Sequence, residues 1–240
     1  MNNVFQRIGK KQTLSQEIQQ KIEESIINKT FVPGQKLPTE KEMCDMFAVS
    51  RTALREALQM LSARGLINVR KGSGIYIENY HPQHVMRPMQ LYLELNLDKE
   101  YLGYIINVRK MIEPPIARMA AKNRTDSDIE KFEKNLADLK NCSDEEFKKE
   151  SLLDRDFHLL IAQSTGNPMI PLMIEPIFQI MPRIKLLVYA EVDVAKNAAL
   201  NYHTKIFDKI KVQDEQGAYD AMWEHIKIAE KHTQMLSEEM

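Results

Sequence analysis

Between residues 33 and 77 the chain carries two helix-start signals, followed by a basic helix and a glycine-rich hairpin. Thr39 has Glu42 three residues later, which is the spacing of a capping box, where each side chain binds the amide of the other residue. Ser50 is a second N-cap and directly precedes an amphipathic stretch. The spacing predicts a short helix that starts after Thr39, a tight turn, and a second helix over 51–61.

The second of these helices combines an apolar face with a basic first turn. One face is predicted to be buried because its apolar residues recur at helical spacing: Ala53, Leu54, Ala57, Leu58 and Leu61. Arg51, Thr52 and Arg55 lie outside that face, in the first turn. A short helix, a tight turn and a helix with an exposed basic amino-terminal end have the layout of a helix-turn-helix, whose second helix enters the DNA major groove.

A hairpin pattern follows the second helix. Residues 66–70 and 75–77 are rich in isoleucine and valine and flank the glycine-containing turn 71–74, which predicts two antiparallel strands. Arg70 and Lys71 place positive charge at the tip of this hairpin. Together with the two helices, the hairpin predicts a winged helix-turn-helix, a module that binds duplex DNA.

The front of the chain is basic although the whole chain is nearly neutral. Residues 1–80 hold 12 Lys and Arg against 8 Asp and Glu, a net charge of +4, whereas the remaining residues hold 21 basic against 26 acidic groups, a net charge of −5. A positive surface suits a phosphate-bearing partner because binding releases counterions from the DNA. The charge distribution therefore supports DNA as the partner of the front part.

The composition excludes several other classes of protein. No stretch of about 18 consecutive apolar residues occurs, so no membrane span and no membrane partner are expected. The first residues lack the apolar core of a signal peptide. Cys44 and Cys142 are far apart and form no CxxC pattern, which indicates two ordinary thiols. We therefore expect a cytoplasmic protein.

From about residue 85 onward, the apolar spacing predicts helices and no strands. The expected helices are 84–95, 98–122, 126–140, 144–164, 168–192, 197–212 and 214–237. Pro114 and Pro115 should kink or break the second of them. The predicted fold class is mainly α, with a winged helix-turn-helix over 1–80, a linker and first connecting helix over 81–95, and an all-α antiparallel helical bundle over 96–240.

Four polar residues in the predicted bundle have the residue types of a metal site. Asp154 and His158 are four residues apart on one helix and therefore point the same way, while His203 and His225 sit on two later helices among apolar neighbours. One carboxylate and three imidazoles that converge in a bundle suit a divalent ion, Zn²⁺ first, with Ni²⁺ or Mn²⁺ as alternatives. The spacing leaves a second interpretation open, in which Asp154 and His158 form a solvated face or a local hydrogen bond.

Two arginines and one asparagine are candidate effector-binding residues. Arg109 precedes Glu113 by one helical turn, which fits either an ion pair within the helix or an inward arginine that binds a carboxylate at two points. Arg183 is a similar candidate on a later helix. Asn167 is either a further contact or a helix cap.

These motifs resemble those of the GntR family of bacterial transcription regulators. In the front half the resemblance is carried by Pro-Gly-Gln-Lys-Leu-Pro-Thr-Glu-Lys-Glu, Val-Ser-Arg-Thr-Ala-Leu-Arg-Glu-Ala-Leu and Lys-Gly-Ser-Gly-Ile-Tyr-Ile, all within residues 33–77. The rear half resembles the FadR-type branch, whose effector domain is the all-helical FCD bundle. The matching segments there are Arg109–Glu113, Asp154–His158, Thr165–Asn167, His203–Ile206 and His225–Ile226.

The resemblance implies roles for individual residues. In the front half it implies DNA contacts for Lys41, Ser50, Arg51, Thr52, Arg55, Lys71 and Gly72. Of these, Arg51 and Arg55 are best suited to base edges, because arginine binds guanine at two points, whereas Ser50, Thr52 and Lys41 suit phosphates. In the rear half it implies an effector-binding and dimerisation domain in which a divalent metal is bound by Asp154, His158, His203 and His225.

The resemblance also implies partners: a near-palindromic double-stranded operator, a second copy of the chain, and a small organic-acid or sugar-acid effector. The resulting hypothesis is a DNA-binding transcription regulator, a repressor and not an enzyme, that senses such an acid at a metal-containing pocket. Two alternatives stay open. One is a metal-free FCD regulator with an acyl or apolar ligand. The other is a metal-dependent hydrolase or lyase fused to a DNA-binding module, which is opposed by the lack of a nucleophile motif or of a general base beyond the predicted ligands.

Overall fold

The computed structural model describes residues 12–143, 146–189 and 195–238. Contacts divide the chain into two compact units, Met1–Val85 and Met86–Met240, and each has its own hydrophobic core. Within the described ranges, no helix has both the length and the apolar character needed to cross a membrane.

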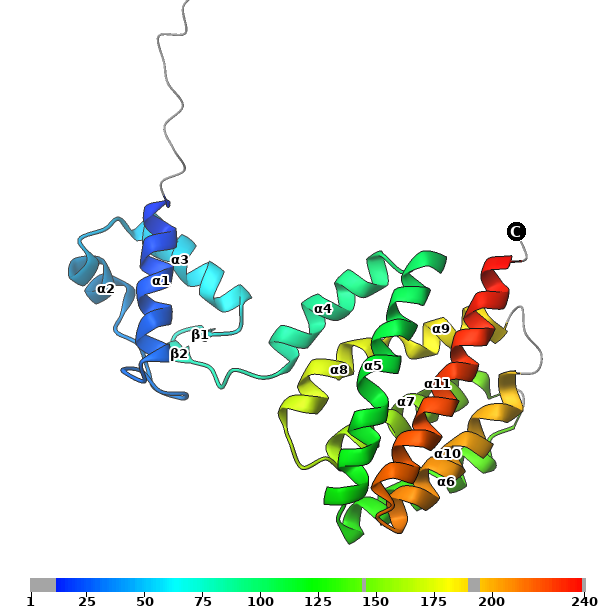
Figure 1. Cartoon of the computed structure of the whole chain (residues 1–240). Coiled ribbons are helices and arrows are strands. Elements are labelled where there is room, and N and C mark those ends of the chain that lie inside the picture. The colour runs from blue at the N-terminus through cyan, green and yellow to red at the C-terminus, as the bar shows by residue number, and fades with distance from the viewer. Residues whose placement is uncertain (1–11, 144–145, 190–194, 239–240) are drawn as a thin grey trace, which may run out of the picture. The chain divides into compact units, whose positions relative to one another are not determined.

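The described part of the first unit combines helices with one antiparallel hairpin (Figure 1). Its elements are α1 (Leu14–Ile27), α2 (Glu40–Phe47), α3 (Arg51–Ala63), β1 (Ile67–Arg70) and β2 (Gly74–Ile77). In the hairpin, Ile67 pairs with Ile77 and Arg70 pairs with Gly74. The structure thus contains the predicted winged helix-turn-helix.

Both predicted N-caps are present. The Thr39 hydroxyl accepts from the Glu42 amide, and the Glu42 carboxylate accepts from the Thr39 amide at 2.7 Å. The Ser50 hydroxyl accepts from the Ala53 amide at 3.3 Å, so α3 begins at the next residue. Between the two helices, Ala48 adopts a left-handed conformation with φ of 55°, which ends α2 and makes the turn.

The core of the first unit forms where α3 packs against α1 and the hairpin. The buried residues of α3 are Leu54, Ala57, Leu58 and Leu61, while Ala53 of the predicted apolar face is only partly buried. They share the core with Ile18 and Ile22 of α1 and with Ile67, Ile75 and Ile77 of the hairpin. Burial of this face leaves the opposite, basic side of the first turn of α3 in solvent.

The second unit is a helical bundle. Its helices are α4 (Gln83–Leu95), α5 (Lys99–Asn123), α6 (Asp126–Lys140), α7 (Phe147–Gln163), α8 (Met169–Gln179), α9 (Met181–Tyr189), α10 (Ala195–Lys211) and α11 (Glu215–Glu238); α4 begins just before the boundary between the units. α5 and α11 lie side by side over much of their length, and α10 packs against both of them (Figure 1).

Two helices differ from the expectation. The helix expected over 168–192 is broken at Ile180 into α8 and α9, and its last residues lie outside the described ranges. The break has a local cause, because Pro182 has no amide hydrogen and is favoured in the first turn of a helix. Conversely, α5 continues through Pro114 and Pro115 without a break, since buried residues on both sides of the prolines hold it in the core.

Candidate functional site

The residues predicted to contact DNA all lie at the surface of the first unit. Exposed side chains or backbone are found at Lys41, Ser50, Arg51, Thr52, Arg55, Lys71 and Gly72. Those in α3 lie within its first five residues, the end of a recognition helix that reaches base edges. The structure therefore gives the predicted residues the accessibility that DNA binding requires, and their individual roles stay predictions.

The hairpin carries an ordered cluster of cations that sequence reasoning only partly found. The Arg70 guanidinium lies 4.5 Å from the centre of the Tyr76 ring, and the Lys36 ammonium lies 5.9 Å from it. The Tyr76 hydroxyl is 2.8 Å from the hydroxyl of Ser73 in the turn. A ring face attracts cations, so Tyr76 holds Arg70 and Lys36 near the wing. Lys71 lines a surface groove beside the hairpin together with Lys36 and Arg70.

An acidic residue is paired with one of the predicted base-reading arginines. Nε of Arg55 donates to Oε2 of Glu40 at 2.8 Å. Glu40 is the first residue of α2 and Arg55 is the fifth of α3, so the pair joins the amino-terminal ends of the two helices. This contact between separate helices has no signal in the local sequence.

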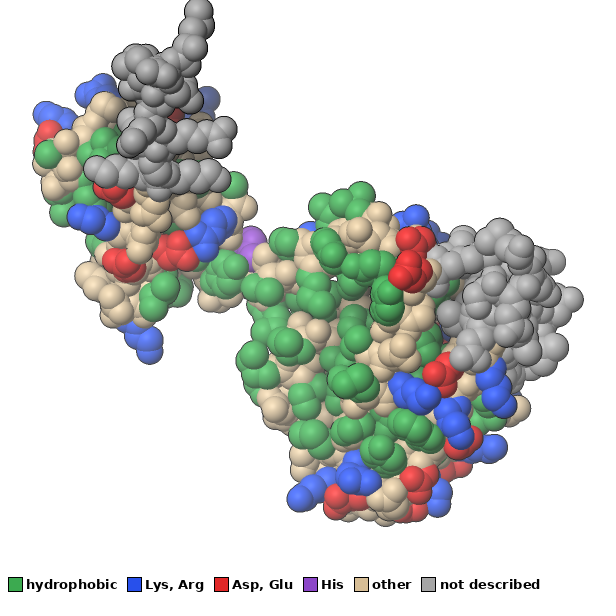
Figure 2. All heavy atoms as spheres, turned by 45° about the horizontal axis from the view of Figure 1, so that its top comes forward, with side chains coloured by type: hydrophobic (Ala, Val, Ile, Leu, Met, Phe, Trp, Pro, Cys, Tyr) green, Lys and Arg blue, Asp and Glu red, His purple; other side chains and the backbone are tan. Residues whose placement is uncertain are grey.

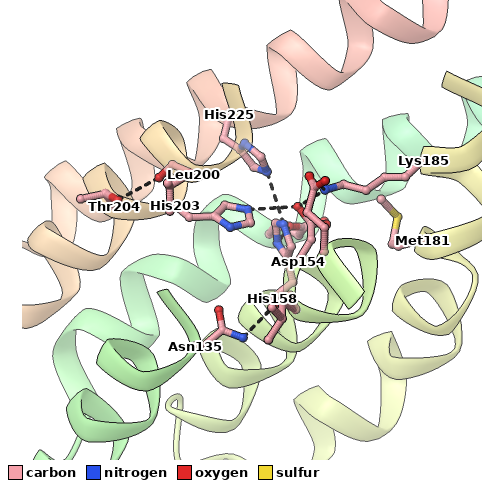
Figure 3. A network of polar contacts seen from close by, with 12 residues as sticks. Asn135, Asp154, His158, Met181, Lys185, Leu200, His203, Thr204 and His225 are labelled. Carbon is pink, nitrogen blue, oxygen red and sulfur yellow. Dashed lines mark hydrogen bonds and ion pairs between the residues drawn. The ribbon is translucent and has the colours of Figure 1, made fainter. Parts of the chain in front are cut away.

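In the second unit the three predicted histidines converge from three helices (Figure 3). His158 comes from α7, His203 from α10 and His225 from α11. One ring nitrogen of each lies within 4.8 Å of the other two, and Nε2 of His158 is 3.3 Å from Nε2 of His225. His158 and His203 are buried and His225 is partly buried. This arrangement could hold a metal ion.

Asp154 faces the same cluster from one turn before His158 on α7. Its Oδ1 lies 3.4 Å from Nε2 of His203 and 2.6 Å from Nζ of Lys185, a residue of α9 (Figure 3). The structure therefore brings together all four residues predicted as metal ligands. Lys185 was not predicted, because no sequence pattern relates α9 to Asp154.

A buried carboxylate orients His158. Nδ1 of His158 lies 2.7 Å from Oε2 of Glu113 on α5, and the other oxygen of Glu113 accepts from Nε of Arg109. A carboxylate on one ring nitrogen fixes the tautomer and the ring direction, so that the second nitrogen can bind a metal. Nε2 of His158 is the nitrogen that faces His225. Glu113 thus has the position of a residue that supports a metal ligand.

The electrostatics of the centre favour the protonation states that bind metal. Burial lowers the pKa of His203 and of His225 well below its usual value, so both imidazoles are neutral near pH 7. Burial would raise the pKa of the Asp154 carboxyl, but Lys185, His203 and His158 together outweigh burial and lower that pKa below its usual range. For Glu113, Arg109 and His158 outweigh burial and lower the pKa to about 2. Neutral imidazole and ionised carboxylate are the forms that ligate metals.

The bonding of His203 provides a test of whether a metal fits. Among the described residues, its buried Nδ1 has no hydrogen-bond partner, and its Nε2 has only the Asp154 carboxylate 3.4 Å away. Buried polar atoms are nearly always paired, and an unpaired one calls for an explanation such as an ion. The donor set of three imidazoles and a carboxylate suits Zn²⁺. The residues therefore fit a divalent ion.

The three candidate effector residues lie in different surroundings. Arg109 is buried beside the centre, where it pairs with Glu113 and its Nη1 lies 3.5 Å from the sulfur of Met181. Asn167 is exposed, and its side-chain oxygen accepts from the amide of Met169, the first residue of α8, at 3.0 Å. Arg183 is exposed and donates to the backbone oxygen of Glu94 at 3.3 Å. Only Arg109 is placed beside the histidine cluster, and the effector roles of all three stay predictions.

Comparisons with known proteins identify a family for each of the two units. The model of the bacterial regulatory proteins of the gntR family matches residues 14–77, and the FCD domain model matches residues 104–227. The Uxu operon transcriptional regulator of Escherichia coli (strain K12) is 31% identical over 88% of this chain and 83% of its own length. The galactonate operon transcriptional repressor of the same strain is 30% identical, over 82% of this chain and 86% of its own length.

One solved structure also resembles most of the chain. The structure of Streptococcus agalactiae GntR matches with a TM-score of 0.64 and 27% identity, over 90% of this chain and 99% of that one. An exposed basic helix with a wing, joined in one chain to a helical bundle around a buried polar centre, defines a DNA-binding transcription regulator. The chain belongs to the GntR family and carries an FCD domain. Its relatives are regulators and not enzymes, which agrees with the prediction and removes the hydrolase or lyase alternative.

Proposed function

We propose that this protein is a repressor that binds a near-palindromic operator as a homodimer and releases it when a small organic acid or sugar acid binds beside a metal ion in the helical unit. The observation that carries the proposal is the convergence of Asp154, His158, His203 and His225 in a buried centre. The proposed DNA target supports a cytoplasmic location for this activity.

The metal and Arg109 would act together on an acidic effector. Zn²⁺ is the ion that the four ligands suit best, with Ni²⁺ or Mn²⁺ as alternatives, and it would offer a Lewis-acidic position for a carboxylate oxygen. Arg109 supplies a buried guanidinium next to the centre. Its partner is now Glu113, so an effector carboxylate that engages Arg109 would compete with Glu113. That competition would change the contacts of α5.

One observation supports a sugar acid as the effector. A relative at 30% identity is named as the repressor of a galactonate operon, and galactonate is a sugar acid.

The coupling between effector and operator is a difference in free energy. An effector releases DNA only if it binds more tightly to the form of the protein that has low operator affinity. By reciprocity, operator DNA must weaken effector binding by the same factor. The proposal therefore requires that selected operator DNA and the acid each lower the affinity of the protein for the other.

A second copy of the chain has a suitable surface on the helical unit. Figure 2 shows hydrophobic side chains gathered over one face of this unit. Exposed apolar residues occur on α4, α5 and α8: Leu91, Tyr92, Leu95, Tyr104, Val108, Met111, Met169 and Met173. Tyr104, Val108 and Met111 share one face of α5 by their spacing. Apolar patches of this kind mark interaction sites, and a symmetric dimer would suit a near-palindromic operator.

The DNA-binding assignment is tested with an operator selected in vitro from a random duplex library. Arg51→Ala and Arg55→Ala should each weaken binding by about 1–3 kcal/mol, because each removes a two-point contact with a base. Lys41→Ala should weaken selected and unrelated sequences alike and reduce the salt dependence. Unchanged operator affinity in both arginine variants would contradict the assignment of α3.

The metal is tested by elemental analysis of the purified protein. His203→Asn and His225→Asn should each lose the bound ion, whereas His81→Asn, at an exposed position of the first unit, should retain it. A full metal content in the His203 and His225 variants would show that the ion lies elsewhere.

The effector class is tested by thermal shift with D-galactonate and with decanoate, each with and without Zn²⁺. A ligand raises the melting temperature in proportion to its occupancy of the folded state. Stabilisation by galactonate that requires Zn²⁺ would support the proposal. Stabilisation by decanoate in metal-free protein would support the acyl-binding alternative instead.

A further inference from the structure

Lys185 places a second cation at the metal centre. Its side chain is 12% exposed and comes from α9, and its ammonium lies 2.6 Å from Oδ1 of Asp154 and 4.0 Å from Oε1 of Glu150. Glu150 and Asp154 are four residues apart on α7, so both present their carboxylates on the same side of that helix. Figure 3 shows Lys185 reaching Asp154 from the side opposite to His203.

The oxygen that Lys185 contacts is the one that faces the histidines. Oδ1 of Asp154 is 2.6 Å from Nζ of Lys185 and 3.4 Å from Nε2 of His203. A zinc–carboxylate bond is about 2.0–2.2 Å long. An ion bound to this oxygen would therefore lie within a few ångströms of the ammonium, where two positive charges repel strongly because little water screens them.

We infer that Lys185 is a built-in competitor of the metal ion: its ammonium neutralises Asp154 in the metal-free bundle and must leave that carboxylate when the ion binds. The inference rests on the metal site of the proposed function. It assigns Lys185 the role of setting the metal affinity, without being a ligand itself.

The competition has two consequences for the protein. Without Lys185, the buried carboxylate of Asp154 in metal-free protein would lose the ammonium that neutralises it, which is strongly destabilising. With Lys185, the metal-free bundle is stable and the affinity for metal is lower than the four ligands alone would provide. Met181 lies one turn before Lys185 on α9 and contacts Arg109. Replacement of the ammonium by a metal ion would thus change the contacts of α9, the helix whose Met181 touches the proposed effector-binding residue Arg109.

Zinc affinity of four proteins tests the inference, measured by competition with a chromophoric chelator at fixed pH and salt. Lys185→Met removes the charge and keeps much of the side-chain length, while Lys185→Arg keeps the charge. Lys209→Met is the matched control, because Lys209 pairs with Asp214 on the surface. Lys185→Met should bind Zn²⁺ about tenfold more tightly than the wild type or better, and Lys185→Arg and Lys209→Met should stay within about threefold of it.

A melting experiment provides an independent readout. Metal-free Lys185→Met should melt at a lower temperature than the metal-free wild type, and saturation with Zn²⁺ should remove that difference. Equal or weaker zinc binding by Lys185→Met overturns the inference and leaves the metal site in place. Zinc binding by Lys185→Met but not by the wild type supports the inference and contradicts the proposed function. Absence of binding in both overturns the two together.

Discussion

Glu40 accepts a hydrogen bond from Nε of Arg55 at 2.8 Å, and this pair joins the first residue of α2 to the start of the second turn of α3. Because Nε is engaged, the two terminal nitrogens of Arg55 are the ones left for O6 and N7 of a guanine. Arg55 is exposed and Glu40 is partly exposed, so the pair adds little to folding stability. The pair instead fixes the direction in which the Arg55 guanidinium points.

Replacing Glu40 should therefore reduce sequence discrimination more than total DNA affinity. In Glu40→Ala, Arg55 must be ordered when DNA binds, at a cost of about 0.5–1.5 kcal/mol for the selected operator. The loss of a negative charge should at the same time strengthen binding to unrelated DNA. Fluorescence anisotropy with selected and unrelated duplexes should show their affinity ratio falling by about tenfold.

The double variant Glu40→Ala, Arg55→Ala separates this explanation from a general charge effect. If Glu40 acts through Arg55, its removal should cost no operator affinity in the Arg55→Ala background. A loss of operator affinity of the same size in both backgrounds would show that Glu40 acts independently of Arg55.

Glu113 should control the metal affinity through His158. Glu113→Gln replaces the carboxylate that lies 2.7 Å from Nδ1 of His158 with a neutral amide, and such changes typically reduce metal affinity about 10–100-fold. The same substitution at Glu100, in the first turn of α5, is the control. Isothermal titration with Zn²⁺ measures both. Equal affinity in the Glu113 variant would mean that His158 needs no carboxylate to bind the ion.

The elements that were predictable from sequence are those with local signals. The caps at Thr39 and Ser50 and the glycine turn of the wing act over three or four residues, and the structure contains all of them. The break between α8 and α9 also had a local signal, Pro182. By contrast, the continuity of α5 through Pro114 depends on packing elsewhere in the bundle, which overrides the local preference.

In the candidate site, too, the features within one helix were predictable and the contacts between helices were not. Helical periodicity placed Asp154 and His158 on one side of a helix, but the convergence of His203 and His225 with them was implied by the resemblance to a family. The contacts of Glu113 with His158 and of Lys185 with Asp154 join different helices. Such contacts follow from the way helices pack, and no spacing within one segment encodes them.

Metal-free protein should lose stability as the pH falls below about 6.5. His203 and His225 have lowered pKa values in the folded state, whereas in the unfolded chain they bind protons near their usual pKa of about 6.5. The unfolded state then binds more protons, so the free energy of unfolding falls with pH by up to about 1.4 kcal/mol per pH unit for each histidine. The lowered pKa values of Asp154 and Glu113 affect the free energy of unfolding only near pH 4 and below.

Urea denaturation between about pH 7.5 and 5.5 measures this slope. Fluorescence of Trp223, the single tryptophan, reports on α11 and hence on the helical unit. His225→Gln should flatten the slope, and His81→Gln, at an exposed position of the first unit, should leave it unchanged. A slope that is the same in all three proteins would mean that His225 takes up a proton without unfolding.

The apolar face of α5 should determine the oligomeric state. Met111 is 75% exposed and Val108 is 41% exposed, so the double variant Val108→Lys, Met111→Lys places two charges in the proposed dimer interface without disturbing the core. Burying unpaired charges is strongly unfavourable, and light scattering should show a shift from dimer to the 27.9 kDa monomer. Met46→Lys, on the exposed face of α2, is the control and should stay dimeric. The monomeric variant should also bind the selected operator far more weakly, because the two half-sites would no longer be engaged by one linked pair of modules. A dimer that persists in the α5 variant would place the interface on another surface.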